Sequence, residues 1–323
     1  MRVGIPAEIE PSLYAHLPEG VEVVRIATDG AAAADKLDLD MWVLPLFPHI
    51  AARVRPQIGK VHVVQSLLAG VDGYLPIIPE GATLCDAQGV HDAPVAEWIV
   101  AAILASLKFL PFYVQMQAAG EWKQRQRAEQ IYRDAHRGEA LKYPAPLEDE
   151  LAGKTVLIVG YGSIGCALEA RLAPFEVTIQ RIGRRGRKGV EPQERLDDLL
   201  PHADVVVLLV PLTEQTRGMF NKTRLAAMKH AALLVNAARG PVVDTDSLVE
   251  ALQAGSIRAA VDVTDPEPLP TGHPLWSAPN LLLTPHIAGA SPRFMERAMR
   301  LLDEQCRRYL DGQPLQHIVR DGY

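Results

Sequence analysis

The stretch from Lys154 to Pro174 constrains the fold of this chain more than any other. An apolar, β-branched run ends in three glycines spaced G-x-G-x-x-G, and the apolar residues that follow recur at helical spacing. Strand, glycine turn and helix form a phosphate cradle, in which the glycines permit a tight turn, a close approach to pyrophosphate and close packing of helix on strand. The sequence therefore predicts a dinucleotide site held by Gly160, Gly162, Ser163, Ile164 and Gly165.

The composition is that of an ordinary globular protein with room for two domains. Of the 323 residues, 48% are hydrophobic and 22% are charged, and the net charge of −6 gives no reason to expect a nucleic-acid partner. We find no signal peptide and no run of the ~20 apolar residues needed to span a membrane, so we expect a cytoplasmic protein without a membrane partner. Cys85, Cys166 and Cys306 are scattered, and we expect three small buried residues, no disulfide framework and no metal site.

The first part of the chain alternates short apolar runs with helical or loop segments, which predicts a parallel α/β layer without a glycine phosphate loop. The expected strands are Arg2–Ile5, Val21–Ile26, Met41–Leu44, Val61–Gln65 and Ala82–Cys85. One long apolar helix follows at about 93–118, interrupted at Pro111. Residues 120–150 are polar and are interpreted as an excursion that leads into the nucleotide domain.

The same rhythm of strand and helix continues after the glycine loop. Strands are expected at Val177–Ile182, Asp204–Val210, Ala231–Asn236, Ala259–Val263 and Leu281–Leu283. Helices are expected at Arg195–Leu200, Asn221–Met228, Asp244–Ala254 and Ser291–Leu310. We therefore predict two domains: residues 1–95 with 290–323, and residues 96–289, with the last helix returning to pack on the first domain.

Three side chains of the nucleotide half follow predicted strands. Arg239, Glu267 and His286 each lie just past a strand end, and parallel strands bring these ends to one edge of a sheet. A guanidinium can grip a carboxylate with two hydrogen bonds, an imidazolium can donate a proton to a carbonyl oxygen, and a carboxylate beside the imidazole favours its charged form. This combination is what the reduction of a 2-keto acid needs.

The chain resembles the D-isomer-specific 2-hydroxyacid dehydrogenase family, and the resemblance covers nearly the whole chain. The matching motifs are Gly160-Tyr-Gly-Ser-Ile-Gly165, Val210-Pro-Leu-Thr-Glu-Gln-Thr-Arg-Gly218, Val235-Asn-Ala-Ala-Arg-Gly240, Asp262-Val-Thr-Asp-Pro-Glu-Pro-Leu269 and Pro285-His-Ile-Ala-Gly289. Within the family the chain is most similar to glyoxylate/hydroxypyruvate reductases. The resemblance implies two Rossmann-like domains, a flavodoxin-like substrate domain and an NAD(P)-binding domain with a doubly wound parallel sheet.

The resemblance also implies roles for individual residues. Arg239, Glu267 and His286 would be catalytic, with His286 as proton donor. Pro211, Thr216, Ala237, Asp262 and Gly289 would contact the cofactor. Leu68, Ala69 and Gly70 lie in a loop whose backbone N–H groups would hold the substrate carboxylate together with Arg239. The family further implies a homodimer formed through the long helix near 93–118.

The segment after Val177–Ile182 indicates which cofactor is used. An NAD enzyme carries Asp or Glu about 20 residues past the glycines to bind the ribose hydroxyls, whereas residues 177–190 contain no acid. Arg181, Arg184, Arg185, Arg187 and Lys188 crowd this segment instead. We therefore predict NADPH as the preferred cofactor, with NADH possible, and assign the 2′-phosphate to Arg184 and Arg185.

Two other function classes stay open at this point. The same fold can serve as a dinucleotide-sensing interaction protein of the corepressor kind, and those proteins also retain the three catalytic residues. An NAD-dependent dehydrogenase of another small oxyanion substrate is the second alternative. The sequence does not identify the side chain of the 2-keto acid.

Overall fold

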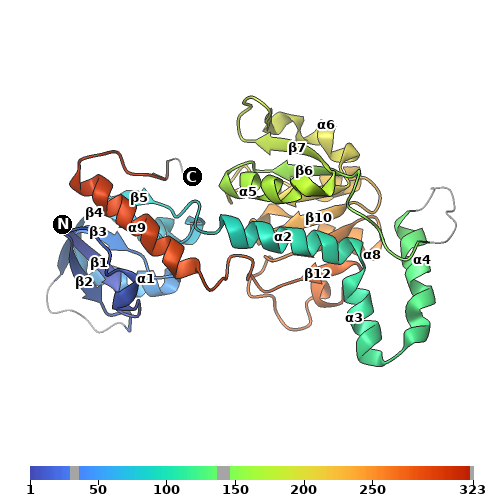
Figure 1. Cartoon of the computed structure of the whole chain (residues 1–323), viewed down its shortest axis with the longest axis horizontal. Coiled ribbons are helices and arrows are strands. Elements are labelled where there is room, and N and C mark those ends of the chain that lie inside the picture. The colour runs from blue at the N-terminus through green and yellow to red at the C-terminus, as the bar shows by residue number, and fades with distance from the viewer. Residues whose placement is uncertain (30–35, 137–145, 321–323) are drawn as a thin grey trace. The chain divides into compact units, whose positions relative to one another are not determined.

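The computed structural model describes residues 1–29, 36–136 and 146–320. The chain divides into two compact units, Met1–Asp92 with Ala290–Tyr323, and Ala93–Gly289 (Figure 1). Each unit contains one parallel β-sheet with helices on both faces. The prediction of two parallel α/β domains is therefore confirmed.

The first unit contains a five-stranded sheet in the order β2-β1-β3-β4-β5. Its strands are β1 (Arg2–Pro6), β2 (Glu22–Ile26), β3 (Leu37–Val43), β4 (Ile58–Gln65) and β5 (Thr83–Cys85). Helix α9 (Phe294–Leu310) buries Ala298, Met299 and Leu302 on one face of this sheet, and α1 (Pro48–Val54) buries Ala51 and Val54 on the other. The C-terminal helix thus belongs to the core of the first unit.

Two strands of the first unit begin earlier than the sequence predicts. Strand β3 begins at Leu37 rather than Met41, and β4 begins at Ile58 rather than Val61. The first half of β3 alternates apolar and polar residues, with Leu39 buried and Asp38 exposed, and in β4 the residues Gly59 and Lys60 separate Ile58 from the apolar run. A continuous apolar run therefore marks only the half of each strand that is buried on both faces.

The second unit contains a seven-stranded sheet in the order β12-β11-β10-β9-β6-β7-β8, and every pair in it is parallel. Its strands are β6 (Thr155–Val159), β7 (Thr178–Gly183), β8 (Glu191–Pro192), β9 (Val205–Leu208), β10 (Leu233–Asn236), β11 (Arg258–Val261) and β12 (Leu281–Leu283). Strands β6, β9, β10 and β11 are buried almost throughout. Such continuous burial is typical of a sheet covered on both faces.

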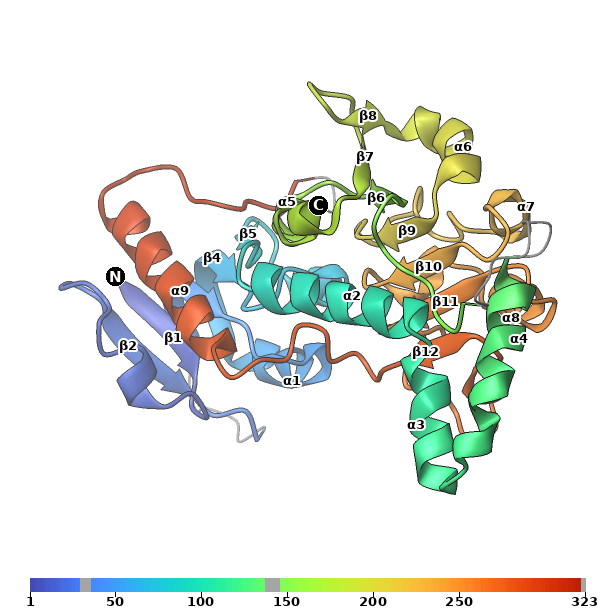
Figure 2. The same ribbon diagram turned by 45° about the vertical axis from the view of Figure 1, so that its right-hand side comes forward.

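Helices cover the two faces of this sheet (Figure 2). One face carries α2 (Asp92–Leu107) and α5 (Ser163–Leu172), and the other carries α6 (Leu196–Leu199), α7 (Lys222–Ala227) and α8 (Thr245–Gln253). Side chains fix where two of these helices begin. Asn221 accepts a hydrogen bond from the N–H of Arg224 at 3.2 Å, and Asp244 accepts one from the N–H of Ser247 at 2.8 Å.

The long helix predicted near 93–118 is two helices. Helix α2 ends at Leu107, α3 runs from Leu110 to Ala119, and their axes differ by 65°. The break falls at Phe109, whose φ is +50°, two residues before Pro111. Proline has no N–H to continue the helical ladder and restricts the residue before it, so a proline in the first turn of α3 fits the start of a new helix.

The polar segment at 120–150 contains a helix that the sequence analysis missed. Helix α4 (Arg125–Ala135) lies beside α3 in Figures 1 and 2, and Ala128 and Tyr132 are the buried residues among the helix positions whose side chains the structure describes. Charged and polar residues dominate this segment, and the sequence analysis therefore interpreted it as an excursion rather than as a helix. Residues 137–145 of the excursion lie outside the described part of the chain.

Among the described residues, no single helix is long and apolar enough to cross a membrane. Helices α2 and α3 together, with the bend between them, reach the length and apolar composition of a membrane span.

Candidate active site and cofactor site

The candidate site residues of the second unit lie on loops at the carboxyl ends of its parallel strands. The glycine turn follows β6, the basic segment follows β7, and Arg239 follows β10. Glu267 lies in the loop after β11, and His286 follows β12. All five loops leave the same edge of one sheet, which is where open α/β sheets bind their ligands.

Glu267 and His286 are in direct contact. The Nδ1 atom of His286 lies 2.6 Å from Oε1 of Glu267, and the two side chains are 47% and 40% exposed. The contact leaves Nε2 as the ring nitrogen that can meet a substrate. His286 has a φ of +53°, and its N–H donates to the carbonyl of Asp262 at 2.7 Å. The left-handed conformation costs free energy that the surrounding hydrogen bonds must offset.

Asp262 holds the loop that carries His286. Its carboxylate is buried and accepts hydrogen bonds from Thr284 Oγ1 at 2.6 Å, from the N–H of Ile287 at 2.9 Å and from the N–H of Ala288 at 2.7 Å. These three charge-assisted hydrogen bonds come from residues before and after His286 in the chain, and together they fix the backbone of His286. The structure thus gives Asp262 an anchoring role, and its predicted contact with the cofactor stays a prediction.

Arg239 is positioned by the turn that follows β10. Its Nη1 donates to the carbonyl of Ala238 at 2.8 Å, and the buried Asn236 donates from Nδ2 to the carbonyl of Arg239 at 3.1 Å. The next residue, Gly240, packs against the backbone of Thr264 in the loop that carries Glu267. The Arg239 turn and the Glu267 loop are therefore neighbours.

The glycine loop has the geometry of a phosphate cradle. Gly160 has a φ of +101°, and a Cβ there would lie 2.5 Å from the carbonyl carbon of Leu209. Gly162 is the N-cap of α5, and a Cβ on it would meet open space among the described residues. A Cβ on Gly165 would lie 3.4 Å from Ile158 of β6, in the contact between helix and strand. Because backbone is exposed at the helix start, these residues fit a pyrophosphate.

The basic segment divides into arginines with different surroundings. Arg181 donates from Nε to Glu169 at 2.6 Å and is also ion-paired with it, so its charge is already matched. Arg184 and Arg185 are exposed, and the structure records no hydrogen bond from either to a described side chain. Arg187 donates to the carbonyl of Tyr161 at 2.6 Å. Arg184 and Arg185, to which the 2′-phosphate is assigned, thus differ from Arg181, and their contact with a cofactor stays a prediction.

The other predicted cofactor residues lie in the same set of loops. Thr216 is buried and donates from Oγ1 to the carbonyl of Pro211 at 2.6 Å, which closes the loop after β9. The N–H of Ala237 donates to the carbonyl of Leu208 at 3.4 Å, and Gly289 is the last residue of the unit. These positions keep all four residues at the carboxyl edge, and their contact with a cofactor stays a prediction.

The predicted substrate loop lies in the first unit, after β4. The N–H of Leu68 donates to Oγ of Ser66 at 3.0 Å, and the carbonyl of Leu68 accepts from the N–H of Ala87 at 3.1 Å. The N–H groups of Ala69 and Gly70 have no recorded partner among the described residues. The amide of Leu68 is thus already engaged within the loop, and the predicted contact of Leu68, Ala69 and Gly70 with a substrate carboxylate stays a prediction.

The cysteines differ from one another. Cys85 and Cys306 are buried, and burial raises their thiol pKa values to about 11 and about 12. Cys166 is exposed on α5, so the expectation that all three are buried was wrong for this residue. The helical period places position 166 on the outer face of α5, beside the buried Gly165.

The described residues contain no group of three or more His, Cys, Asp or Glu side chains that could hold a metal.

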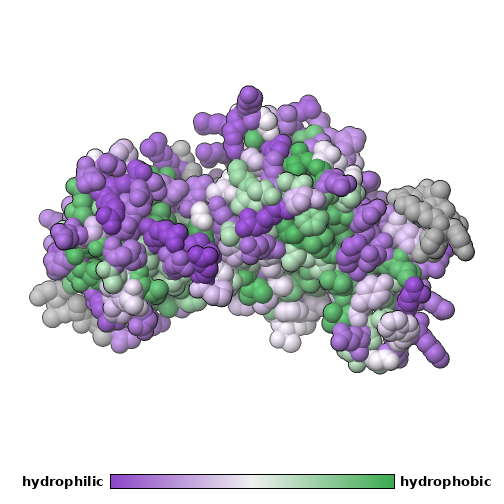
Figure 3. Space-filling model, in the orientation of Figure 1, coloured by the Kyte–Doolittle hydropathy of each residue, from purple (hydrophilic) through white to green (hydrophobic). Residues whose placement is uncertain are grey.

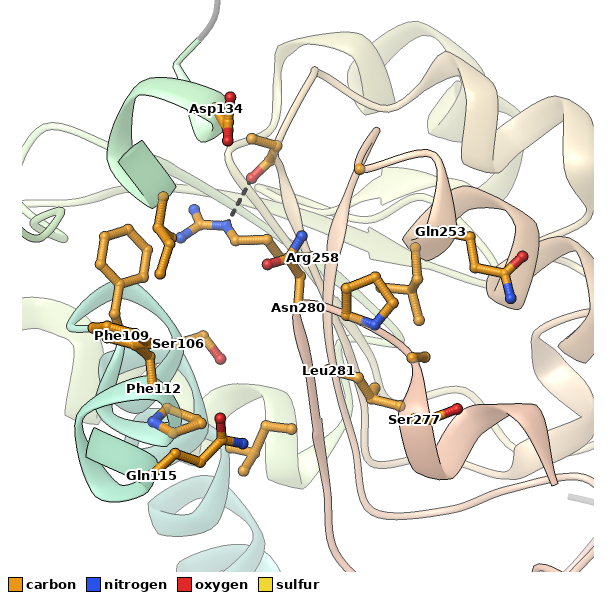
Figure 4. Close-up of a pocket in the computed structure, with 18 of the residues that line it drawn as sticks. Ser106, Phe109, Phe112, Gln115, Asp134, Gln253, Arg258, Ser277, Asn280 and Leu281 are labelled. Atoms are coloured by element: carbon orange, nitrogen blue, oxygen red, sulfur yellow. Dashed lines mark hydrogen bonds between the residues drawn. The ribbon is translucent and has the colours of Figure 1, made fainter. Parts of the chain in front are cut away.

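A cavity of about 690 Å³ lies in the same unit, next to α3, α4 and the amino ends of β11 and β12 (Figure 4). It is lined by Phe109, Phe112, Arg258 and Asn280 among others. Arg258 donates from Nε to the carbonyl of Ala231 at 3.0 Å and is ion-paired with Asp149. Because Arg258 begins β11, this cavity lies at the edge of the sheet opposite to the carboxyl ends.

Comparisons with known proteins agree with this arrangement. The model of the family described as D-isomer specific 2-hydroxyacid dehydrogenase, NAD binding domain, matches residues 100–288. A glyoxylate reductase of Thermofilum pendens is 35% identical over 287 residues, covering 85% of this chain and 80% of that protein. A mitochondrial formate dehydrogenase of Hordeum vulgare is 35% identical over 301 residues, covering 88% and 75%.

Solved structures extend the similarity over the whole chain. An NADPH-dependent glyoxylate/hydroxypyruvate reductase of Sinorhizobium meliloti, in complex with NADP and sulfate, matches with a TM-score of 0.78 and 27% identity, covering 100% of this chain and 99% of that one. The candidate residues at the carboxyl edge of the sheet, the glycine cradle and these matches all support the same family assignment. The chain belongs to the D-isomer-specific 2-hydroxyacid dehydrogenase family of NAD(P)-dependent oxidoreductases.

Proposed function

We propose that this enzyme reduces a small 2-keto acid of the glyoxylate or hydroxypyruvate type to the D-2-hydroxy acid and prefers NADPH. The observation that carries the proposal is the 2.6 Å contact between His286 and Glu267, on the same edge of the sheet as the glycine cradle. The relatives named glyoxylate reductase and glyoxylate/hydroxypyruvate reductase support the substrate class. The basic segment 184–188 and the absence of an acid in residues 177–190 support NADPH.

Each side chain has a task in this reaction. Arg239 grips the substrate carboxylate and polarises the neighbouring carbonyl. The loop of Leu68, Ala69 and Gly70 in the first unit is assigned to the substrate, as the family resemblance implies. The bound nicotinamide supplies the hydride. His286 donates a proton from Nε2 to the carbonyl oxygen, which becomes the hydroxyl, and Glu267 fixes the ring through Nδ1. The histidine then takes a proton from water for the next turnover.

Formate oxidation is the second candidate, because formate dehydrogenases are among the relatives. Removing a hydride from formate leaves carbon dioxide, and no proton moves to or from oxygen. A histidine held by a carboxylate would then have no proton to transfer. The His286–Glu267 pair therefore favours reduction of a carbonyl over oxidation of formate.

The test is a panel of substrates with both cofactors. Consumption of NADPH and NADH is followed with glyoxylate, hydroxypyruvate, pyruvate and bulkier 2-keto acids, and reduction of NAD⁺ and NADP⁺ is followed with formate. We expect NADPH to be consumed with glyoxylate and with hydroxypyruvate. Turnover of formate alone would overturn the substrate class, and no turnover of any member would favour a corepressor-like sensor.

The proton donor is tested by His286→Ala. We expect kcat for keto-acid reduction to fall by roughly 10²–10⁴-fold, because general acid catalysis contributes about that much. Dissociation constants for the cofactor should stay within about threefold of wild type. A variant that retains wild-type kcat would remove His286 from the mechanism.

Assembly and location are part of the same proposal. We infer a homodimer formed through α2 and α3, since hydrophobic residues gather over these helices on one face of the second unit (Figure 3). Leu110 and Val114 of α3 are 49% and 61% exposed, and Trp122, which follows α3 in the chain, is 79% exposed. We assign the first unit to the substrate and the second to the dinucleotide, and expect the enzyme in the cytoplasm. Sedimentation of wild type and of Val114→Glu tests the dimer, which the charge should weaken.

A further inference from the structure

Two buried glutamine side chains join α9 to the end of β4. Gln65 is the last residue of β4, Gln305 lies in α9, and the two residues are 1% and 0% exposed. Nε2 of Gln305 donates to Oε1 of Gln65 at 2.9 Å. Burying an amide costs free energy unless its polar atoms are hydrogen-bonded, and an apolar pair of similar size would avoid that cost. Packing alone therefore does not explain why two amides lie here.

The nitrogen of the Gln65 amide holds the first residues of two loops. This Nε2 donates to the carbonyl of Ser66 at 2.8 Å and to the carbonyl of Asp86 at 3.0 Å. Ser66 begins the loop after β4, and Asp86 begins the loop after β5. The hydroxyl of Ser66 accepts from the N–H of Leu68 at 3.0 Å and donates to the Leu68 carbonyl at 2.9 Å. A series of hydrogen bonds thus leads from Gln65 into the loop assigned to the substrate.

Gln305 connects the same series to the C-terminal segment that follows α9. Its Oε1 accepts from the N–H of Gln316 at 2.9 Å, and its Nε2 also donates to the carbonyl of Gln316 at 3.0 Å. The segment then runs antiparallel to β5, where the N–H of Asp86 donates to the carbonyl of His317 at 3.0 Å. The N–H of Asp86 is therefore held by the C-terminal segment, and its carbonyl is held by Gln65.

Backbone groups decide how both amides are oriented. The N–H of Gln316 can only donate, so the atom of Gln305 that meets it must be Oε1. The carbonyls of Ser66 and Asp86 can only accept, so the atom of Gln65 that meets them must be Nε2. The two remaining atoms, Nε2 of Gln305 and Oε1 of Gln65, then meet as donor and acceptor. Each amide thus fits in one orientation, and a buried network of this kind specifies one arrangement of the segments it joins.

We propose that Gln305 and Gln65 are positioning residues that hold the substrate loop, residues 68–70, in the conformation that binds the substrate carboxylate. They act through Ser66 and do not touch the substrate. This role rests on the assignment of residues 68–70 to the substrate in the proposed function. Loss of either amide should therefore weaken substrate binding and leave the dinucleotide site, which we assign to the other unit, unchanged.

The test separates substrate binding from stability. Gln65→Met and Gln305→Met remove the amides and keep most of the side-chain volume. The matched control is Leu302→Ala, since Leu302 is a buried residue of α9 that packs in the apolar core of the same unit. With saturating NADPH, we expect KM for glyoxylate to rise by roughly 3–10-fold in both methionine variants, the effect of losing about one hydrogen bond, and kcat to stay within about twofold. In Leu302→Ala, KM should keep its wild-type value.

The double variant shows whether Gln305 acts through Gln65. If it does, Gln305→Met should change KM by less than about twofold once Gln65→Met is present. Additive effects on KM would contradict this order of action. Titration with NADP⁺ is the second check, and its dissociation constant should stay within about twofold of wild type in every variant, the range of a site that has lost no hydrogen bond. A rise equal to that of KM would mean that the damage is general, and the positioning role would be wrong.

Hydrogen exchange of the backbone N–H groups of residues 66–70 gives a readout that needs no turnover. Relative to the N–H groups of β1, we expect faster exchange in both methionine variants and wild-type exchange in Leu302→Ala. If wild type reduces no 2-keto acid, the proposed function fails, and the exchange rates still test the two glutamines. Methionine variants that match Leu302→Ala in exchange and in KM would overturn the positioning role. Should Gln65→Met fail to fold, Ser66→Ala removes the next hydrogen bonds of the series and should raise KM and the exchange rate in the same way.

Discussion

A Cβ atom on Gly240 would lie 1.9 Å from the carbonyl oxygen of Thr264. The turn that carries Arg239 and the loop that carries Glu267 thus meet backbone against backbone, with no room for a methyl group. Thr245 adds a hydrogen bond across the same contact, from Oγ1 to the carbonyl of Asp265 at 2.8 Å. The spacing of Arg239 and Glu267, the two side chains proposed to be catalytic, therefore depends on a glycine that has no side-chain chemistry of its own.

Gly240→Ala should damage both stability and catalysis. The nearest atoms belong to backbone, which cannot swing away, so we expect destabilisation of about 1–3 kcal/mol, as for other overpacked sites. We also expect kcat/KM to fall at temperatures where the variant is fully folded, since the Arg239 turn must move. Thermal unfolding and steady-state kinetics on the same preparation check this. Wild-type values in both measurements would mean that the contact adjusts without cost.

Arg239→Lys keeps the charge and removes the planar pair of donors. We expect kcat/KM with 2-keto acids to fall by roughly 10–100-fold. A hydrogen bond to a charged group contributes about 1.5–3 kcal/mol, and this fold-change corresponds to the loss of one such bond. Binding of NADP⁺ should persist, because the cradle is formed by other loops. Kinetics and cofactor titration of the same variant measure the two effects. An unchanged kcat/KM would assign Arg239 to a structural role.

Asp149 forms a buried ion cluster far from the proposed chemistry. Its Oδ2 lies 3.1 Å from Lys154 Nζ, 3.6 Å from Arg258 Nη2 and 3.4 Å from His136 Nε2. Asp149→Asn would leave buried cations without their carboxylate, so we expect a loss of about 3–5 kcal/mol. Asp198→Asn is the control, because its pair with Arg195 is exposed and should contribute at most about 1 kcal/mol. Urea unfolding of both variants makes the comparison.

The contribution of Asp149 should also depend on pH. Burial favours the neutral acid, but Lys154, a backbone N–H and Arg258 outweigh it and hold the pKa of Asp149 below its usual value. A depressed carboxyl pKa stabilises the fold fully above the unfolded pKa of about 3.9, and the gain is lost as pH falls through the folded pKa. The difference between wild type and Asp149→Asn in urea should therefore be constant from pH 5 to 7 and shrink below pH 4. A gap that widens in acid would contradict the sign.

Reversal of cofactor preference should require a change at Arg187 as well as at Gly183. A carboxylate introduced by Gly183→Asp would lie beside the Arg187 guanidinium, which would neutralise it before it reached a ribose. We therefore expect Gly183→Asp with Arg184→Ala to lower the NADPH preference only partly. Adding Arg187→Ala should bring the ratio of kcat/KM values to favour NADH. Equal ratios for the double and triple variants would show that Arg187 does not influence the choice.

Much of this site could be predicted from the chain alone. The glycines at 160, 162 and 165 have a spacing that serves a local turn, and β6 and α5 appear where the apolar pattern changes period. Arg239, Glu267 and His286 were placed by strand ends, which a parallel sheet brings to one edge. The pairing of Glu267 with His286 follows from neighbouring loops, and the structure brings them together.

Other features could not be predicted, because each depends on a partner that is distant in sequence. The sequence could not show that Arg181 and Arg187 have different surroundings, because only the fold brings Glu169 into contact with Arg181. The engagement of the Leu68 amide could not be predicted without the position of the Ser66 hydroxyl. Helix α4 was missed because its few buried residues gain their burial from tertiary packing.

The sequence by itself determined the class of fold, the position of the phosphate cradle and the types of side chain at the sheet edge. These follow from local spacing and from the rule that parallel strands end together. Only the tertiary structure decided which charges are matched, which amides remain available and which glycine fixes the distance between loops. Those properties depend on side-chain and backbone contacts between segments that are far apart in the chain. The spacing of residues along the chain does not predict such contacts.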